Sequence, residues 1–314
     1  MRDGTPSCFC VRNNRGGGEE EEEVGPQNLV TCTYWAELGV GGGRRRAVTV
    51  TVTWCKNGVG QGLCVGVGEE PGKLSFCKVD LRPWFFWRKQ GLKRLDFDEA
   101  TVWVFWDLSS ARFGAGPEPR EGFYVAVVCG NEAALVLGDM KEAALRRTRA
   151  GNPLTEAVLV SRKEHIFGNR YFATRARFGG SGRSHEVGIE CRTKGPDDPA
   201  LLVSVDREPV MEVKRLRWKF RGNDTIYVEG VPVQFLWDVH DWLFSPGLGH
   251  AMFVFKPVEC VSGKSAAAAA AAAAALASEC KSSACFLESV SSSRDGNYYV
   301  PSDFFLLLYA WKCD

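Results

Sequence analysis

The sequence lacks any apolar run long enough to cross a membrane. The alanine tract with its following Leu276 and Ala277 gives twelve apolar residues at 266–277, and the longest run outside it, FFLLLYAW at residues 304–311, contains eight, whereas a membrane-spanning helix needs about 20. The first ten residues, MRDGTPSCFC, contain no apolar signal segment, and the glutamates at residues 19–23 are atypical of an organelle transit peptide. We therefore expect no transmembrane segment and a cytoplasmic location, with the nucleus as an alternative.

Signals for disulfides and metal sites are also few. The 12 cysteines are scattered and include no C-x-x-C pair, which is unlike the dense spacing of a disulfide scaffold. Only four histidines occur, and none has a partner at the H-x-x-x-H spacing of a metal site. We expect most cysteines to be buried as small hydrophobic side chains, and we expect neither a metal ion nor a cofactor.

A strong net charge is absent as well, because the whole chain carries only +1. Residues 1–27 carry −3 and residues 258–314 carry −2, which leaves +6 for residues 28–257. That mild basic bias is compatible with an anionic partner, either a protein or a phosphate-bearing molecule. It is far below the charge of a dedicated nucleic-acid-binding protein, so nucleic acid is the weaker alternative.

Short segments rich in β-branched and aromatic residues make up most of the chain. The segment AVTVTVTW (47–54) alternates valine with threonine, and this alternation is typical of a β-strand with one buried face. Similar segments follow, separated by glycine, proline and asparagine. One helix is predicted, over residues 139–151, with aspartate at its start, strong helix formers inside and glycine at its end. The pattern predicts an all-β, antiparallel protein.

The order of these segments repeats along the chain. VFWDLSSARF (104–113) has a counterpart in FLWDVHDWLF (235–244), CKVDLRP has one in VSVDREP, and LKRLDF has one in VKRLRWKF. We predict an internal duplication of two units, 28–139 and 155–312, linked by a helix and linker at 140–154. Each unit is expected to be an antiparallel β-sandwich or a partly open barrel. The alternative is that common turn dipeptides match by chance.

Two segments offer little to bury and are predicted to be disordered. Residues 1–27 are rich in glycine and glutamate, and residues 261–298 contain a ten-alanine tract among serines. The second segment interrupts the second unit between FVFKP and FFLLLYAW. We expect these two flanking segments to pair as a hairpin with a swollen tip, because closure entropy grows slowly with loop length.

The stretch FLWDVHDWLF suggests either a catalytic site or a structural corner at the end of a strand. Asp107 and Asp238 each end a predicted strand before one helical turn, where a carboxylate accepts otherwise unpaired backbone N–H groups. The corner occurs in both units, which favours a structural role for these caps. His240, Asp241 and the nearby His250 occur only in the second unit. They are the candidates for a catalytic site.

The segment VKRLRWKFRGN (213–223) carries the strongest signal for binding. As a strand it would place Leu216, Trp218 and Phe220 on one face. The opposite face would hold four cations: Arg215, Arg217, Lys219 and Arg221. Such a row attracts phosphate or an acidic protein surface. The alternative is an ordinary solvated face of a strand.

The aromatic segment PWFFWRKQG (83–91) places four aromatic residues before Arg88 and Lys89. Platforms that stack nucleic-acid bases combine these residue types, and so do anchors at a membrane interface. Packing of most of these rings in the core is the interpretation that we favour.

Several long stretches of the chain are specific enough to compare with known families. They include VTVTWCKNGVGQGLCVGV, CKVDLRPWFFWRKQG, SRKEHIFGNRYFATRARF and VPVQFLWDVHDWLF. Together they resemble the plant family catalogued as domain of unknown function 868, over nearly the whole chain outside the acidic run and the alanine tract. The resemblance implies a land-plant protein, and it implies no activity, catalytic residue or cofactor.

Two functions are compatible with these patterns. The leading hypothesis is a non-catalytic binding or scaffold protein, which would hold an anionic or protein partner on the basic segment that contains Arg215, Arg217, Lys219 and Arg221. The alternative is a hydrolase or isomerase that uses His240, Asp241 and His250.

Overall fold

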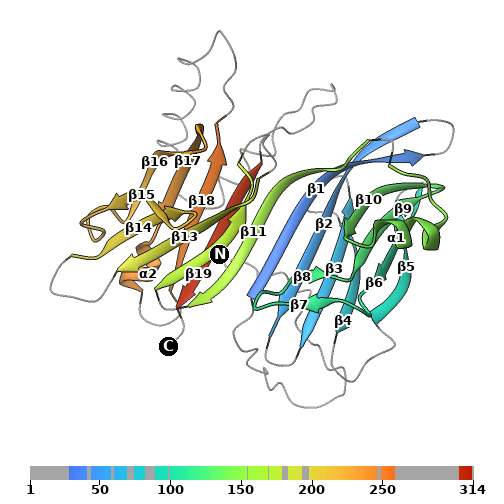
Figure 1. Cartoon of the computed structure of the whole chain (residues 1–314), viewed down its shortest axis with the longest axis horizontal. Coiled ribbons are helices and arrows are strands. Elements are labelled where there is room, and N and C mark those ends of the chain that lie inside the picture. The colour runs from blue at the N-terminus through green and yellow to red at the C-terminus, as the bar shows by residue number, and fades with distance from the viewer. Residues whose placement is uncertain are drawn as a thin grey trace, which may run out of the picture. The chain divides into compact units, whose positions relative to one another are not determined.

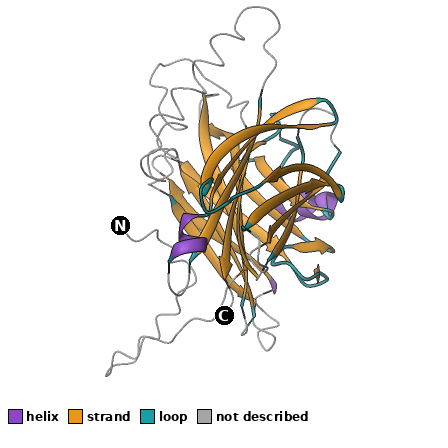
Figure 2. Cartoon of the chain, turned by 90° about the vertical axis from the view of Figure 1, so that its left-hand side faces the viewer, coloured by secondary structure: helices purple, strands orange, loops and turns teal. Residues whose placement is uncertain are grey.

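The computed structural model describes residues 28–40, 44–57, 60–68, 74–81, 89–97, 100–153, 155–168, 170–178, 183–192, 198–245, 249–258 and 304–312. These residues form strands and two short helices (Figure 2), so the fold is all-β. No helix among them is long and apolar enough to span a membrane. The segments 1–27 and 261–298, for which disorder is predicted, lie outside the described residues, as does most of the aromatic segment 83–91.

Nine strands form one sheet, in the order β16–β17–β18–β19–β11–β1–β2–β3–β4 (Figure 1). Their bounds are β1 (Asn28–Val40), β2 (Arg44–Lys56), β3 (Gln61–Gly68), β4 (Ser75–Leu81), β11 (Val158–Gly168), β16 (Arg221–Val228), β17 (Val231–Asp238), β18 (His250–Pro257) and β19 (Phe305–Lys312). Neighbouring strands pair antiparallel, except that β11 and β19 are parallel. Strands from both predicted units contribute to this sheet.

Two four-stranded sheets accompany the nine-stranded one, in the orders β10–β9–β6–β5 and β12–β13–β14–β15. Their bounds are β5 (Gln90–Phe97), β6 (Ala100–Asp107), β9 (Tyr124–Cys129), β10 (Glu132–Gly138), β12 (Tyr171–Ala176), β13 (His185–Arg192), β14 (Ala200–Val205) and β15 (Glu208–Val213). The short strands β7 (Arg112–Phe113) and β8 (Pro119–Glu121) pair with each other, and the helices are α1 (Lys141–Thr148) and α2 (His240–Phe244).

The first hydrophobic core lies between β1–β4 and the sheet of β5, β6, β9 and β10. Val48, Val50 and Val52 of β2 are at most 1% exposed and belong to this core, as the alternation in AVTVTVTW predicts. The helix α1 lies against β9 and β10, where Ala144 joins a separate small cluster with Tyr124. The six cysteines that the structure describes are all buried, as expected for small hydrophobic side chains.

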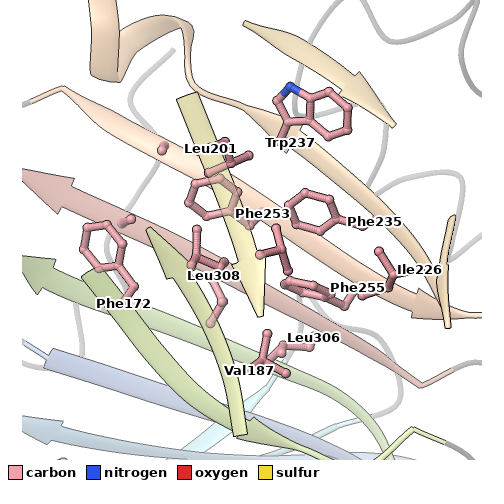
Figure 3. Close-up of a cluster of buried hydrophobic side chains, with 14 of the residues drawn as sticks. Phe172, Val187, Leu201, Ile226, Phe235, Trp237, Phe253, Phe255, Leu306 and Leu308 are labelled. Atoms are coloured by element: carbon pink, nitrogen blue, oxygen red, sulfur yellow. The ribbon is translucent and has the colours of Figure 1, made fainter. Parts of the chain in front are cut away.

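The second hydrophobic core lies between the sheet β12–β15 and the strands β16–β19. Phe235, Phe253 and Phe255 are 0% exposed, and the ring centroids of Phe235 and Phe255 are 4.6 Å apart. Figure 3 shows these rings beside Leu201 of β14, which belongs to the same cluster. Each half of the chain therefore buries its apolar side chains between a four-stranded sheet and part of the nine-stranded sheet.

The hairpin predicted around the alanine-rich insert is confirmed. β18 and β19 pair antiparallel, with Phe253 opposite Leu308 and Phe255 opposite Leu306. In the first half, β9 and β10 form the corresponding pair. The strand FFLLLYAW thus returns beside FVFKP although more than forty residues separate the two strands in the sequence.

The helix is shorter than predicted, and Asp139 is not its N-terminal cap. The carboxylate of Asp139 instead accepts the backbone N–H groups of Gly122 at 2.9 Å and Phe123 at 3.1 Å, and these hydrogen bonds lower the pKa of Asp139. The helix ends where Arg149 adopts a left-handed φ of 55°, two residues before the predicted terminating Gly151.

The prediction that residues 213–223 form one strand is wrong. Residues 214–220 form a turn between β15 and β16. Arg215 has a φ of 57°, which lies outside the range of β-strands. Leu216 is 0% exposed whereas Trp218 is 82% exposed, so these two side chains do not share a face.

The two halves share one register around their corner tryptophans. Gly91 lies opposite Trp106 across β5 and β6, and Gly222 lies opposite Trp237 across β16 and β17. A Cβ atom added to Gly91 or Gly222 would lie 2.4 or 2.3 Å from the facing indole. In this register β5 of the first half is the counterpart of β16 in the second half. The earlier comparison of LKRLDF with VKRLRWKF is therefore corrected. The register aligns the sequence WRKQG with WKFRG instead.

We expect the substitution Gly222→Ala to destabilise the protein by about 1–3 kcal/mol, because the added methyl group would displace a packed indole ring. Trp237 is only 8% exposed, and its Nε1–H donates to the carbonyl oxygen of Lys219 at 2.9 Å, so the ring has little freedom to move. Urea unfolding measures the loss. Gly116→Ala is the control, since a Cβ there meets nothing within 4 Å, and equal midpoints for the two variants would contradict the prediction.

A charged cluster on β11 lies between the two cores. Arg162 pairs with Leu306 of β19 on one side, and Leu306 belongs to the second core. On its other side Arg162 pairs with Cys32 of β1, the strand whose Leu38 belongs to the first core. Directly opposed residues point to the same face of a sheet. Arg162 and Glu164 therefore share the face on which both cores pack.

Hydrogen bonds to Arg162 connect the halves at this cluster. Its guanidinium donates to both carboxylate oxygens of Glu118, at 2.9 and 2.5 Å, and to Glu164. Glu164 is 4% exposed and also accepts a hydrogen bond from Thr174 at 2.6 Å. Burial raises the pKa of the nearby Cys32 thiol to about 11. Glu118 comes from the first half and Thr174 from the second, so this network joins them.

We expect Arg162→Met to lower the free energy of unfolding by about 3–5 kcal/mol, because it leaves two carboxylates near the core without their cation. Adding Glu118→Gln and Glu164→Gln should recover much of that loss, since neutral amides tolerate burial better. Chemical denaturation of the single and triple variants tests both statements. Arg112→Met is the control, because Arg112 pairs with Glu121 on the surface, where its side chain is 80% exposed. A loss no larger than the control's would refute the importance of the network.

Candidate functional site

The turn at residues 214–220 and Arg221 at the start of β16 are hereafter called the basic turn, and its backbone is fixed by hydrogen bonds. The backbone N–H of Leu216 donates to the carbonyl of Pro199 at 2.8 Å, and the N–H groups of Trp218 and Lys219 donate to the carbonyl of Arg215 at 2.9 and 3.0 Å. The buried side chain of Leu216 anchors the turn in the second core. These contacts hold the backbone in one conformation while most side chains point to solvent.

The cations of the basic turn fall into two groups. Arg221 pairs with Asp238 at 2.7 Å, and Lys214 pairs with Glu212 at 3.4 Å. The second group consists of Arg215, Arg217 and Lys219, which are exposed. Among the residues that the structure describes, no carboxylate forms an ion pair with this second group.

Aromatic side chains adjoin these cations. Trp218 is 82% exposed, and Phe244 of α2 is 48% exposed. The ring of Phe220 contacts Phe244 at a centroid distance of 5.8 Å and His240 at 5.3 Å, and the guanidinium of Arg221 lies 5.6 Å from its centroid. The basic turn therefore combines cations with apolar ring surface.

The corner aspartates make the same hydrogen bonds in both halves. One carboxylate oxygen accepts the backbone N–H two residues further on, at 3.0 Å for Asp107 and 3.1 Å for Asp238. The other oxygen accepts a side-chain hydrogen bond from the facing strand, from Gln90 at 3.0 Å and from Arg221 at 2.7 Å. Contrary to prediction, a helix follows only the second aspartate, as α2. The shared contacts give both aspartates a role in shaping the corner.

The three residues suggested for catalysis are only partly brought together. His240 Nδ1 lies 2.9 Å from Asp241 Oδ1, and their side chains are 41% and 50% exposed. His250 lies on β18, where its ring contacts that of Trp311 at 4.7 Å. His250 thus belongs to a different ring cluster. Within the described part of the chain, no group of three or more His, Cys, Asp and Glu residues is placed to hold a metal ion.

That second ring cluster is centred on His165, which the sequence pattern does not single out. Its imidazole stacks on Tyr309 of β19 at 4.8 Å, and its Nδ1 accepts a hydrogen bond from Trp311 Nε1 at 3.2 Å. Burial, together with the nearby charges of Lys163 and His250, lowers the pKa of His165 to about 4. A neutral ring at neutral pH is consistent with its role as an acceptor.

Comparison with known proteins places the chain in a family. The family described as plant protein of unknown function (DUF868) matches residues 25–312. The chain belongs to this family. The DUF868 match runs from β1 to the end of β19 and so includes the basic turn, and it confirms the resemblance seen in the sequence. No curated protein and no solved structure matches the chain.

The sequence pattern indicates the cations of the basic turn but not Trp218, because a strand would bury that ring beside Leu216. The alignment of WRKQG (87–91) with WKFRG (218–222) is the signal that could have corrected this error. In this alignment Trp218 precedes β16, the strand that pairs with the corner residues at the end of β17, and so lies outside the sheet.

The lowered pKa of His165 predicts a loss of stability in acid. The unfolded chain binds a proton on this side chain near pH 6.5, whereas the folded protein binds it only near pH 4, so the stabilisation is present above pH 6.5 and is lost as pH falls toward 4. Between pH 7 and pH 4 the wild type should therefore lose up to about 3 kcal/mol more than His165→Gln. Denaturant unfolding across this range measures the difference. Parallel pH profiles for the two proteins would contradict the prediction.

Proposed function

We propose that the protein is a non-catalytic binding or scaffold protein that holds an anionic partner on the basic turn. The observation that carries the proposal is the set of three exposed cations, Arg215, Arg217 and Lys219, that lack a carboxylate partner among the described residues. Cations already held in ion pairs have little left to offer a ligand, whereas these three retain their attraction for phosphate or carboxylate groups. The role is proposed for the cytoplasm.

The rigidity of the turn supports the same proposal. Binding costs free energy when a loop must be ordered, and a loop that is already ordered avoids this cost. Leu216 and the hydrogen bonds to Pro199 and Arg215 fix the turn before any partner arrives. The exposed ring of Trp218 adds a side chain type that often dominates interface energetics.

We also infer that the two halves arose by duplication. The matching Gly–Trp pairs and the matching aspartate corners support this inference. If the halves are copies, contacts that recur in both belong to the common fold. The sequence aligned with 214–220 in the first half, PWFFWRK (83–89), carries two cations where the second half carries four. The extra cations of the basic turn are then a specialisation of the second half.

The enzyme alternative receives less support. His240 and Asp241 form a half-exposed pair on α2, and the ring of His240 packs against Phe220 and Phe244. The contacts of His250 lie with Tyr309 and Trp311. We therefore assign the binding role to the basic turn and no reaction to these histidines.

We expect the combined variant Arg215→Ala, Arg217→Ala, Lys219→Ala to elute from heparin at lower salt than the wild type. Each lost phosphate-like contact should reduce the slope of log affinity against log salt concentration by about 1. The control removes the same charge from three exposed cations that are held in ion pairs: Arg94, Arg112 and Arg192. If the two triple variants behave alike, net charge alone explains the retention and the proposed site is wrong.

A further inference from the structure

The exposed side chains of the basic turn belong to only two chemical classes. Between Lys214 and Arg221 the sequence KRLRWKFR contains cations and apolar residues, with no carboxylate, amide or hydroxyl group. Leu216 turns inward and Phe220 is half-buried. What remains exposed in the turn is the cations and the indole of Trp218, and Phe244 adds apolar area through its contact with Phe220.

This composition suits a partner that presents negative charge, hydrogen-bond acceptors and apolar area. A folded protein partner normally exchanges hydrogen bonds in both directions around a buried anchor, whereas the side chains of the turn donate hydrogen bonds but accept none. An anionic bilayer requires no acceptor on the protein, because its phosphate and carboxylate groups are themselves acceptors. Its headgroups attract juxtaposed lysines and arginines, and tryptophan prefers the boundary between headgroups and acyl chains because its ring is apolar and its N–H is polar.

The fixed conformation of the turn suits insertion of a single ring. The backbone at Trp218 is tied to Arg215, and the adjoining carbonyl of Lys219 accepts the indole N–H of Trp237. The indole of Trp218 is therefore held out at 82% exposure by a rigid support. Arg215, Arg217 and Lys219 lie within three residues of it along the chain and can meet headgroups while the ring enters the interface.

We propose that the basic turn is a docking site for an anionic lipid surface, with Trp218 entering the interface and Arg215, Arg217 and Lys219 meeting the phosphate and carboxylate groups of the lipids. This inference rests on the proposed function, because it names the anionic partner of the same turn. Attachment of this kind is peripheral and reversible, and it strengthens with the fraction of anionic lipid.

The experiment measures binding of the full chain to vesicles of phosphatidylcholine mixed with phosphatidylserine, by sedimentation. We expect binding to these vesicles and little binding to vesicles of phosphatidylcholine alone. The triple variant Arg215→Ala, Arg217→Ala, Lys219→Ala should bind on the order of 100-fold more weakly, and Trp218→Ala roughly 10-fold more weakly. Tyr171→Ala is the aromatic control, because Tyr171 is 55% exposed on β12, at the far edge of the four-stranded sheet from the turn.

Insertion itself has a separate readout. Brominated acyl chains should quench part of the tryptophan fluorescence of the wild type, and Trp218→Phe should lose that quenching while it keeps most of its binding. Circular dichroism confirms that each variant is folded. Quenching that persists in Trp218→Phe would show that another ring inserts, and this would overturn the assignment.

The outcomes separate this inference from the proposed function. Salt-sensitive retention on heparin that needs the three cations, combined with no binding to anionic vesicles, overturns the lipid surface and leaves the binding role intact. Binding to single-stranded oligonucleotides that depends on Trp218, without vesicle binding, overturns it in favour of base stacking. If the wild-type protein binds neither heparin nor anionic vesicles, both proposals are rejected.

Discussion

The pairing of β11 with β1 on one side and with β19 on the other is the constraint on which the structure depends. The ladder of β11 with β1 joins the two halves, and the ladder of β11 with β19 connects β11 to the other strands of the second half, so that all nine strands form one sheet. Both cores rest on the same face of that sheet, and Arg162 with Glu164 lies between them. Burying these charges costs free energy that only their mutual hydrogen bonds offset. The charges therefore favour one alignment of the three strands, since a shift of one residue would turn them to the opposite face.

The basic turn depends on this arrangement through the second core. Leu216 packs in that core, and Trp237 of the corner donates a hydrogen bond to the carbonyl oxygen of Lys219. The corner in turn is shaped by Asp238, which pairs with Arg221 at the end of the turn. Gly222, Trp237 and Asp238 recur in the first half as Gly91, Trp106 and Asp107 and thus form the support, whereas the added cations of the basic turn are among the residues that differ between the halves. A rigid scaffold that presents a few variable surface side chains is a common basis for recognition.

Local patterns predicted the strands well but misjudged long-range structure. The alternation in AVTVTVTW identifies β2 and its buried face, because a period of two has one structural meaning. The same reasoning failed at residues 214–220, where cations and apolar residues alternate as in a strand but the buried contact of Leu216 and the left-handed Arg215 impose a turn. Asp139 was misread because its carboxylate accepts hydrogen bonds from residues far away in the sequence. Both halves share one sheet, and β11 pairs parallel with β19. Neither feature leaves a signal in the local sequence pattern.

The place of β19 in the sheet sets the order in which the protein can be completed during synthesis. The buried residues of the first core all lie between residues 36 and 135, so that core can close early on the ribosome. The second core includes Leu306, Leu308 and Ala310, and β11 and β18 have exposed ladder edges until β19 arrives. A nascent chain therefore carries two open strand edges through translation of the alanine-rich stretch, and such edges invite association with other chains.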